Sequence, residues 1–191
     1  SRRQRQMCIR DRIKTPFYGE KLDGLINAKS GCLTGIVNGL DYDEYNPAKD
    51  PLIYANYDAR TFRKEKIKNK RGLQKELGLS QDDKKFMIGI VSRLTDQKGF
   101  DLIDYVIEEI CAEDTQLVVL GTGEEKYENL FRHFAWKYPD RVSANIYYSN
   151  ERSHKIYAAC DAFLMPSLFE PCGLSQLMSC LLYTSPSPRD T

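Results

Sequence analysis

The sequence predicts an α/β fold built around a parallel β-sheet. From Lys85 onward, short and continuous apolar runs alternate with segments whose apolar residues recur at helical spacing. The first apolar run is 86–91, and the helical pattern after it consists of Ile103, Val106, Ile107 and Ile110. Continuous apolar strands that alternate with helices favour parallel pairing and right-handed crossovers. With 191 residues, the chain is long enough for one ordinary domain and little more.

The segments before Lys85 are less regular. Residues 13–40 contain apolar residues at helical spacing (Leu22, Leu25 and Ile26) and then a short strand-like run at 33–37. Residues 41–57 hold two X–Pro pairs and several tyrosines without periodicity, which indicates an irregular crossover segment. Residues 60–79 are rich in Lys and Glu and predict a surface helix that ends at Gly78, with its charges on a solvated face.

Three further pairs of strand and helix complete the pattern. The predicted strands are 117–120, 142–147 and 162–165, and the predicted helices are 122–135, 151–159 and 173–180. Thr122 and Glu125 have the spacing of a capping box, which would open the first of these helices. The alternation predicts the first part of a Rossmann-like domain.

The two ends of the chain differ from its middle. Residues 1–12 and 181–191 lack periodicity, and the second stretch interrupts an apolar helix pattern. We interpret both as non-native sequence or disordered tails, and expect the remainder to belong to a longer protein. The expected organisation is the end of a preceding domain at 13–40, a crossover with a helix at 41–83, and a partial Rossmann-like domain at 84–180.

Composition excludes several classes of protein. No apolar run approaches the roughly 18 residues that a membrane helix needs, and the six cysteines include no C-x-x-C pair that would indicate zinc. We expect free thiols, a reducing cytoplasm, no membrane partner and no metal. Five arginines and one aspartate give residues 1–12 a local charge of +4. No RNA-binding module or helix-turn-helix pattern follows, so we expect no nucleic-acid partner; the oligomeric state stays open.

Charged residues follow the first predicted strand. Arg93 and Lys98 flank a turn, and Gly99 permits close backbone approach where the next helix begins. Open parallel sheets bind ligands at the carboxyl ends of their strands, where helix N-termini favour anions. Two cations at this place are suited to a diphosphate. The alternative is that Arg93 and Lys98 are only exposed charges at a helix start. Gly121, after the second strand, is a weaker signal because glycine often serves only the geometry of such turns.

A second motif follows the fourth predicted strand. Glu170 precedes Cys172, Gly173 and Leu174, which open the last predicted helix. A carboxylate here would bind sugar hydroxyls or the charge of an oxocarbenium-like state, and the amides after it would bind phosphate. The alternative is that Glu170 only stabilises the helix N-terminus, by about 0.3 to 1 kcal/mol. Together the two motifs predict a nucleotide-sugar site.

Four strings in order resemble the family of bacterial glycogen synthases and plant starch synthases. They are TPFYG at 15–19, GIVNGLDYD at 35–43, SRLT with QKG at 92–99, and PS with FEPCGL at 166–174. The resemblance runs from about Ile13 to Cys180. It implies an α/β chain from a GT-B glycosyltransferase, mainly the first half of the C-terminal, Rossmann-like donor-binding domain.

The resemblance also implies a reaction and roles for residues. The family transfers glucose from ADP-glucose to the non-reducing end of an α-1,4-glucan with retention, without a cofactor or required metal. Arg93 and Lys98 would hold the donor diphosphate, and Glu170 would contact the transferred glucose. Cys172 to Leu174 would line the phosphate pocket.

Three further residues are assigned to the donor site on the same resemblance. Asn38 would face the cleft, and Gly121 is placed among the donor-binding residues. Tyr148 would stack on the base, although the residues alone leave it equally compatible with a core aromatic.

Other features separate this family from its alternatives. Related retaining transferases carry a second glutamate at the position of Met178, and its absence favours the synthases. The family's Lys-x-Gly-Gly segment, the histidine of its first domain and its Thr-Gly-Gly loop are absent. His133 and His154 lie in predicted donor-domain helices and cannot replace that histidine. We therefore expect the polypeptide as written to be inactive and to lack most of the acceptor site. The alternatives are another GT-B nucleotide-sugar transferase and a non-catalytic nucleotide-binding domain, which would have no need of Glu170.

Overall fold

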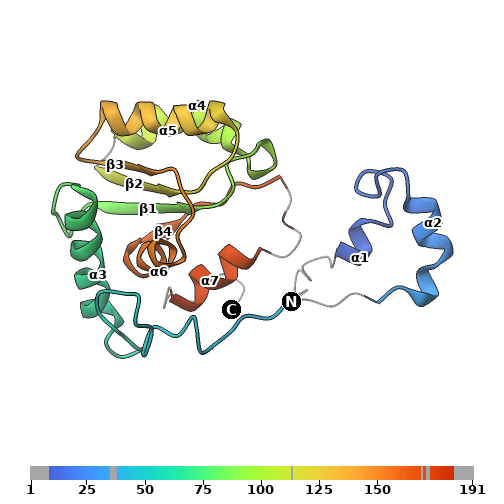
Figure 1. The fold of residues 1–191 in the computed structure, drawn as a ribbon, viewed down its shortest axis with the longest axis horizontal. Helices are drawn as coiled ribbons and strands as arrows, with labels where there is room; N and C mark the ends of the chain where they lie inside the picture. Colours follow the sequence, from blue (N-terminus) through green and yellow to red (C-terminus); the bar gives the residue numbers. More distant parts are fainter. Residues whose placement is uncertain (1–8, 35–37, 113, 169, 171–172, 183–191) are drawn as a thin grey trace. The chain divides into compact units, whose positions relative to one another are not determined.

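A computed structural model describes residues 9–34, 38–112, 114–168, 170 and 173–182 (Figure 1). Within these residues the chain forms two compact units. The larger unit comprises residues 41–168 and 175–182, and the smaller comprises 9–40, 170 and 173–174.

The larger unit contains a parallel sheet with strand order β3-β2-β1-β4. Its strands are β1 (Phe86–Val91), β2 (Thr115–Leu120), β3 (Val142–Asn145) and β4 (Ala162–Phe163). β1 and β2 are in register along their whole length, whereas β4 pairs only with Ile88 and Gly89. This confirms the predicted α/β fold with a parallel sheet.

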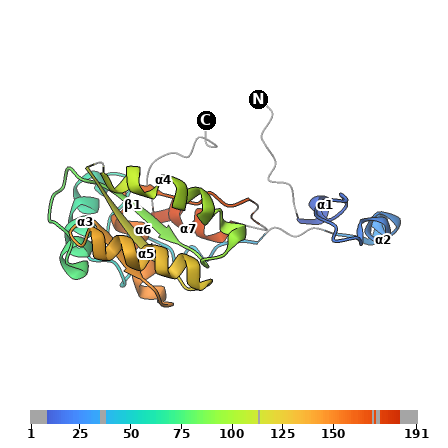
Figure 2. The same cartoon turned by 90° about the horizontal axis from the view of Figure 1, so that it is seen from above.

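Helices cover both faces of this sheet. They are α3 (Phe62–Leu77), α4 (Phe100–Ala112), α5 (Glu125–Lys137), α6 (Asn150–Ala159) and α7 (Leu174–Leu182). α4 and α5 lie on one face and α6 on the other (Figure 1), and Figure 2 shows α4 and α5 side by side above the strands. The chain moves outward from β1 through β2 to β3, and then returns to β4 on the other side of β1. The carboxyl ends of β1 and β4 therefore form the switch point at which such sheets bind ligands.

Two apolar cores result from the alternation of side chains along β1 and β2. Ile90, Leu117 and Val119 face α4 and α5 and join the buried rings of Phe100 and Phe131, which meet edge to face at 5.7 Å. The opposite side chains face α3 and α6 in a second cluster, which includes Leu73, Met87, Val118, Leu120 and Ile156. Apolar clusters thus fill both faces, and the exposed polar groups of the site lie at the edge of the sheet.

The predicted capping box at Thr122 and Glu125 is wrong. α5 begins at Glu125, its N-cap residue is Glu124, and no side chain caps it there. The Leu94 amide donates to the Thr122 carbonyl at 2.9 Å, and the Glu124 amide donates to the Leu94 carbonyl at 2.7 Å. This pairing keeps residues 122–124 extended, so the helix cannot begin earlier.

Two predicted strands are shorter than expected. The third ends at Asn145 rather than Tyr147, because β2, its partner within the described residues, ends at Leu120. The fourth covers Ala162–Phe163 rather than 162–165. After it, the Leu164 amide makes one more bond to the Gly89 carbonyl, and Pro166 has no amide hydrogen to continue the ladder.

The predicted surface helix is confirmed as α3, which Gly78 ends in a left-handed conformation. Its charges do not all face solvent, however. Lys70 is buried and its Nζ lies 2.5 Å from Asp161 Oδ2, and the side-chain Nε2 of Gln74 donates to Gln116 Oε1 at 2.8 Å. The apolar stripe of α3 is thin because polar residues complete its buried face.

The smaller unit holds short elements. They are α1 (Ile9–Arg12), α2 (Asp23–Ala28) and the 3₁₀ turn Ser30–Cys32. α2 contains Leu25 and Ile26 of the predicted helical pattern. Of the strand-like run, Leu33 and Thr34 lie outside any strand, and 35–37 fall outside the described residues. No helix in the described part of the chain is long and apolar enough to cross a membrane.

The packing of α4 predicts a contrast between two neighbouring residues. Ile103 is 2% exposed in the core, whereas Leu102 is 55% exposed. Ile103→Ala should lower the free energy of unfolding by about 2 to 5 kcal/mol because it leaves a cavity. Leu102→Ala should change it by about 0.5 kcal/mol or less. Urea unfolding followed by circular dichroism measures both, and equal losses would contradict the assigned packing.

Candidate functional site

The loop after β1 is held against the loop after β2. The Ser92 amide donates to the Leu120 carbonyl at 3.1 Å, and Leu94 pairs with Gly123 in a further parallel bridge. In such an extended segment successive side chains point in opposite directions. Leu94 is accordingly buried in the core, whereas Arg93 is exposed at the switch-point edge.

The turn that follows carries Lys98 to the start of α4. Residues Asp96–Lys98 form a 3₁₀ turn, and Gly99 closes it with φ +71°. A Cβ atom at Gly99 would lie well inside contact distance of the Pro166 carbonyl oxygen. The Leu168 amide also donates to the Gln97 carbonyl at 3.0 Å. The loop after β4 therefore crosses directly against the turn that carries Lys98.

The structure explains why position 121 is a glycine. A Cβ atom there would collide with the Ser92 carbonyl oxygen, so only glycine allows the loops after β1 and β2 to approach this closely. The geometric interpretation of this glycine is thus sufficient, and its role in donor binding stays a prediction.

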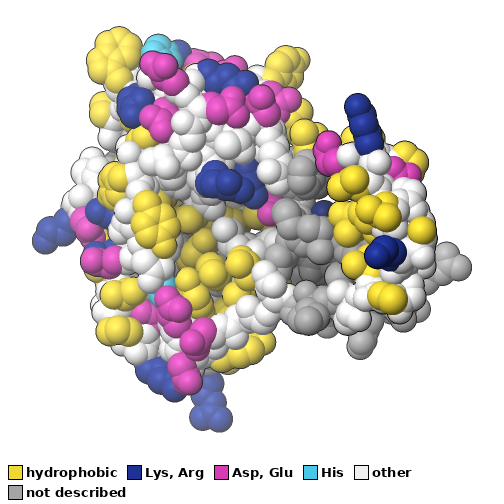
Figure 3. Space-filling view, turned by 45° about the vertical axis from the view of Figure 1, so that its right-hand side comes forward, with side chains coloured by type: hydrophobic (Ala, Val, Ile, Leu, Met, Phe, Trp, Pro, Cys, Tyr) yellow, Lys and Arg dark blue, Asp and Glu magenta, His cyan; other side chains and the backbone are white. Residues whose placement is uncertain are grey.

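The charges of this edge differ in their pairing. Among the described residues, no acceptor or carboxylate contacts the Arg93 guanidinium. Asp96 is paired: its Oδ1 accepts from Lys126 Nζ and from the Tyr127 hydroxyl, both at 2.5 Å. The hydrogen bond that Lys126 donates to Asp96 lowers the pKa of Asp96 and raises the pKa of Lys126. In Figure 3 basic side chains stand near the middle of the larger unit, with acidic side chains above and below them.

Tyr148 lies directly before α6. The Ser149 hydroxyl caps this helix by accepting from the Arg152 amide at 3.1 Å. The Tyr148 side chain is 90% exposed, so the alternative that it is a core aromatic is wrong. Its ring is available for stacking.

The remaining predicted site residues belong to the smaller unit. Asn38 is exposed, and Glu170 is partly buried, with its backbone carbonyl accepting from Arg12 Nη1 at 2.6 Å. Gly173 has φ +72°, and Leu174 is the first residue of α7. Cys172 lies outside the described residues.

The structure thus brings Arg93, Lys98 and Gly121 together at one edge of the larger unit. Asp96, Lys126 and Tyr127 join this edge but were not among the predicted site residues. Asp96 lies inside the motif that singled out its neighbours. Lys126 and Tyr127 carry no signal in the sequence, because their partner is about 30 positions away.

A doubly covered parallel sheet with two cations at its switch point defines an α/β domain suited to a phosphorylated ligand. The chain belongs to the glycosyl transferases of group 1, whose family model matches residues 74–180. This family membership places the switch-point loops within a known class of sugar-transferring enzymes.

The relatives share one name. The chain is 73% identical over 179 residues to the glycogen synthase of Lachnoclostridium phytofermentans, covering 94% of this chain and 37% of that protein. It is 71% identical over 181 residues to the glycogen synthase of Lachnospira eligens, covering 95% and 38%. The chain therefore spans little more than a third of the length of these relatives. The predicted resemblance to glycogen synthases is confirmed.

A solved structure agrees with the fold. The catalytic domain of Starch Synthase IV from Arabidopsis thaliana, bound to ADP and acarbose, superposes with a TM-score of 0.81 at 34% identity. The match covers 90% of this chain and 35% of that chain. It confirms the predicted fold class, part of a GT-B glycosyltransferase.

The crossing at Gly99 predicts a difference between two glycines with similar backbones. Gly78 has φ +69° with no atom within 4 Å of an added Cβ, whereas Gly99 has φ +71° and faces the Pro166 carbonyl. Gly78→Ala should cost about 1 to 2 kcal/mol of unfolding free energy for the left-handed backbone. Gly99→Ala should cost roughly 3 kcal/mol or more, because the Pro166 loop must also move. Urea unfolding compares them, and a Gly99→Ala cost no larger than that of Gly78→Ala would exclude the close crossing.

Proposed function

We propose that this chain supplies the donor-binding part of an ADP-glucose-dependent glucan synthase. The parent enzyme would transfer glucose from ADP-glucose to the non-reducing end of an α-1,4-glucan with retention, in the cytoplasm and without a metal or cofactor. One observation carries this proposal. Arg93 and Lys98 lie on the loop at the switch point of a chain that is 73% identical to a glycogen synthase.

Arg93 and Lys98 are proposed to bind the donor diphosphate. Cleavage of the bond between glucose and ADP leaves negative charge on the departing phosphate, and cations placed beforehand stabilise that charge. A guanidinium offers paired donors to phosphate oxygens. Because Arg93 has no partner among the described residues, binding a phosphate there breaks no ion pair with any of them.

Tyr148 is proposed to stack on the nucleotide base. Aromatic stacking on a base contributes about 1 to 3 kcal/mol and tolerates different bases. The exposure of the ring supports this role. The choice of ADP is supported by the starch synthase neighbour, whose structure holds ADP.

Glu170 is proposed to contact the transferred glucose, and Asn38 to face the cleft. A carboxylate beside the reacting carbon stabilises an oxocarbenium-like state. The amides of residues 172–174 are proposed to meet the donor phosphate at the start of α7, where a helix N-terminus favours an anion. The order of the FEPCGL string after β4 supports these roles.

The diphosphate role predicts that ADP binds to this chain through Arg93. Arg93→Ala should raise the dissociation constant for ADP about tenfold or more, because charge-assisted hydrogen bonds are lost. Arg63→Ala provides the matched control, since Arg63 is an exposed arginine on α3. Isothermal titration of ADP into the unsubstituted chain and both variants measures the effect. Identical ADP affinities in the two variants would contradict the assignment of Arg93 to the diphosphate site.

The role of Glu170 is tested in a complete enzyme. We would replace the matching segment of the Lachnoclostridium phytofermentans synthase by residues 13–180 of this chain, and assay transfer from labelled ADP-glucose to glycogen. The chimera should be active, and Glu170→Ala should reduce kcat about 100-fold or more while changing ADP affinity by less than about threefold.

Two outcomes would contradict these proposals. A folded chimera that transfers no glucose would count against the donor function. A loss of ADP affinity by Glu170→Ala as large as that by Arg93→Ala would count against the separation of roles.

A further inference from the structure

The turn that carries Lys98 is fastened by the first residues of α5. Asp96 Oδ1 accepts two hydrogen bonds at 2.5 Å, from Lys126 Nζ and from the Tyr127 hydroxyl. The Asp96 amide also donates to the Glu124 side chain at 3.1 Å. The middle of the turn is therefore tied to the start of a helix that follows a different strand.

The Tyr127 hydroxyl is a rigid anchor. The Tyr127 side chain is 4% exposed and its ring packs 5.4 Å from the ring of Phe100, the first residue of α4. Lys126 Nζ lies 4.6 Å from the centre of the Tyr127 ring. Because the ring is fixed in the core, its hydroxyl holds the Asp96 carboxylate at a fixed place.

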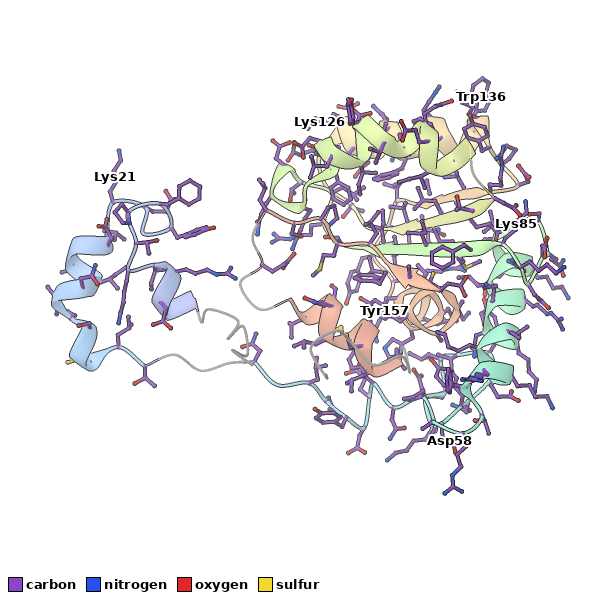
Figure 4. All side chains as sticks on the ribbon, turned by 180° about the vertical axis from the view of Figure 1, so that it is seen from behind. Lys21, Asp58, Lys85, Lys126, Trp136 and Tyr157 are labelled. Atoms are coloured by element: carbon purple, nitrogen blue, oxygen red, sulfur yellow. The ribbon has the colours of Figure 1, made fainter. Side chains whose placement is uncertain are left out.

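The contact with Lys126 also neutralises the charge of Asp96. Asp96 lies between Arg93 and Lys98 in sequence, and an unpaired carboxylate there would repel a diphosphate. Lys126 pairs with this carboxylate and also lies 3.4 Å from Glu124. Figure 4 shows Lys126 at the end of α5 opposite to Trp136, away from Lys85, which directly precedes β1. Lys126 therefore stands at the carboxyl edge of the sheet.

We infer that Asp96, Lys126 and Tyr127 are positioning residues of the diphosphate site. Tyr127 and Lys126 hold the Asp96 turn so that it presents Lys98, and Lys126 cancels the negative charge beside the bound phosphates. This inference rests on the proposed function for its ligand, whereas the holding of the turn is independent of any ligand.

The other end of α5 offers matched controls. Lys137 Nζ donates to Glu108 Oε1 at 2.5 Å, and the Tyr138 hydroxyl donates to the same oxygen at 2.8 Å. A lysine, a tyrosine and a carboxylate are thus also combined at the C-terminal end of α5, where Lys137 is the last residue and Tyr138 the C-cap. Lys137→Met and Tyr138→Phe thus remove the corresponding hydrogen bonds to Glu108 without changing residues 93–99.

The experiment compares both sets of variants in the 191-residue chain with ADP as the probe. Lys126→Met should raise the dissociation constant for ADP about three- to tenfold, since it exposes the Asp96 charge. Adding Asp96→Asn to Lys126→Met should restore most of this loss, which a purely structural defect would not allow. Tyr127→Phe should weaken ADP binding about threefold, and both control variants should bind like the unsubstituted chain.

Amide hydrogen exchange without ligand gives a second readout. Tyr127→Phe should speed exchange at Lys98 and Gly99, whose amides bond within the turn, whereas Tyr138→Phe should not. If the unsubstituted chain binds no ADP, the proposed function fails for this chain, and exchange still decides whether the turn is held. Equal exchange and equal affinity in the test and control variants would overturn the inference.

Discussion

The close approach of three loop backbones at the carboxyl edge of the sheet determines the rest of the site. Leu94 pairs with Gly123, and the chain at Gly99 passes against the carbonyl of Pro166. A Cβ atom at Gly99 or Gly123 would collide with the facing carbonyl oxygen, so the loops after β1, β2 and β4 pack in direct backbone contact. Because the two faces of the sheet are sealed by separate apolar cores, this edge is where cations gather without being buried. Arg93 and Lys98 are thus carried by a stiff frame rather than by independent loops.

Electrostatics adds a second constraint to that frame. This edge carries residues of both signs of charge, and they differ in their pairing. Asp96 is engaged by Lys126 and Tyr127, while the Arg93 guanidinium has no partner in the described parts of the chain. An anion that binds at Arg93 therefore displaces no described carboxylate from this guanidinium. Under the proposed function, which the family membership and the glycogen synthase relatives support, this anion is the diphosphate of a sugar nucleotide.

Elements that depend on local sequence patterns were predicted correctly. The predictions were wrong where residues distant in the sequence determine the start of a helix or the burial of a side chain. β1 and α4 follow from an apolar run and a helical stripe, and both are found. The helix start at Thr122 was wrong because pairing with Leu94 keeps that segment extended. The solvated face of α3 was wrong at Lys70, whose partner Asp161 lies on a remote loop. The same distinction applies to the site. Arg93 and Lys98 follow directly after a predicted strand, and this local position was sufficient to place them at the edge of the sheet. The link from Lys126 to Asp96 depends on the register of two loops, which no local pattern contains.

The central claim is that the switch-point edge binds the nucleotide diphosphate, and titration of the ¹⁵N-labelled chain with ADP tests it most directly by NMR. The largest shifts are expected at the amides of Arg93, Lys98 and Gly121, with smaller ones at Tyr148. Residues at the opposite edge, such as Phe86 and Thr115 at the starts of β1 and β2, should not shift. Saturable shifts confined to that opposite edge, or none at Arg93 and Lys98, would contradict the claim.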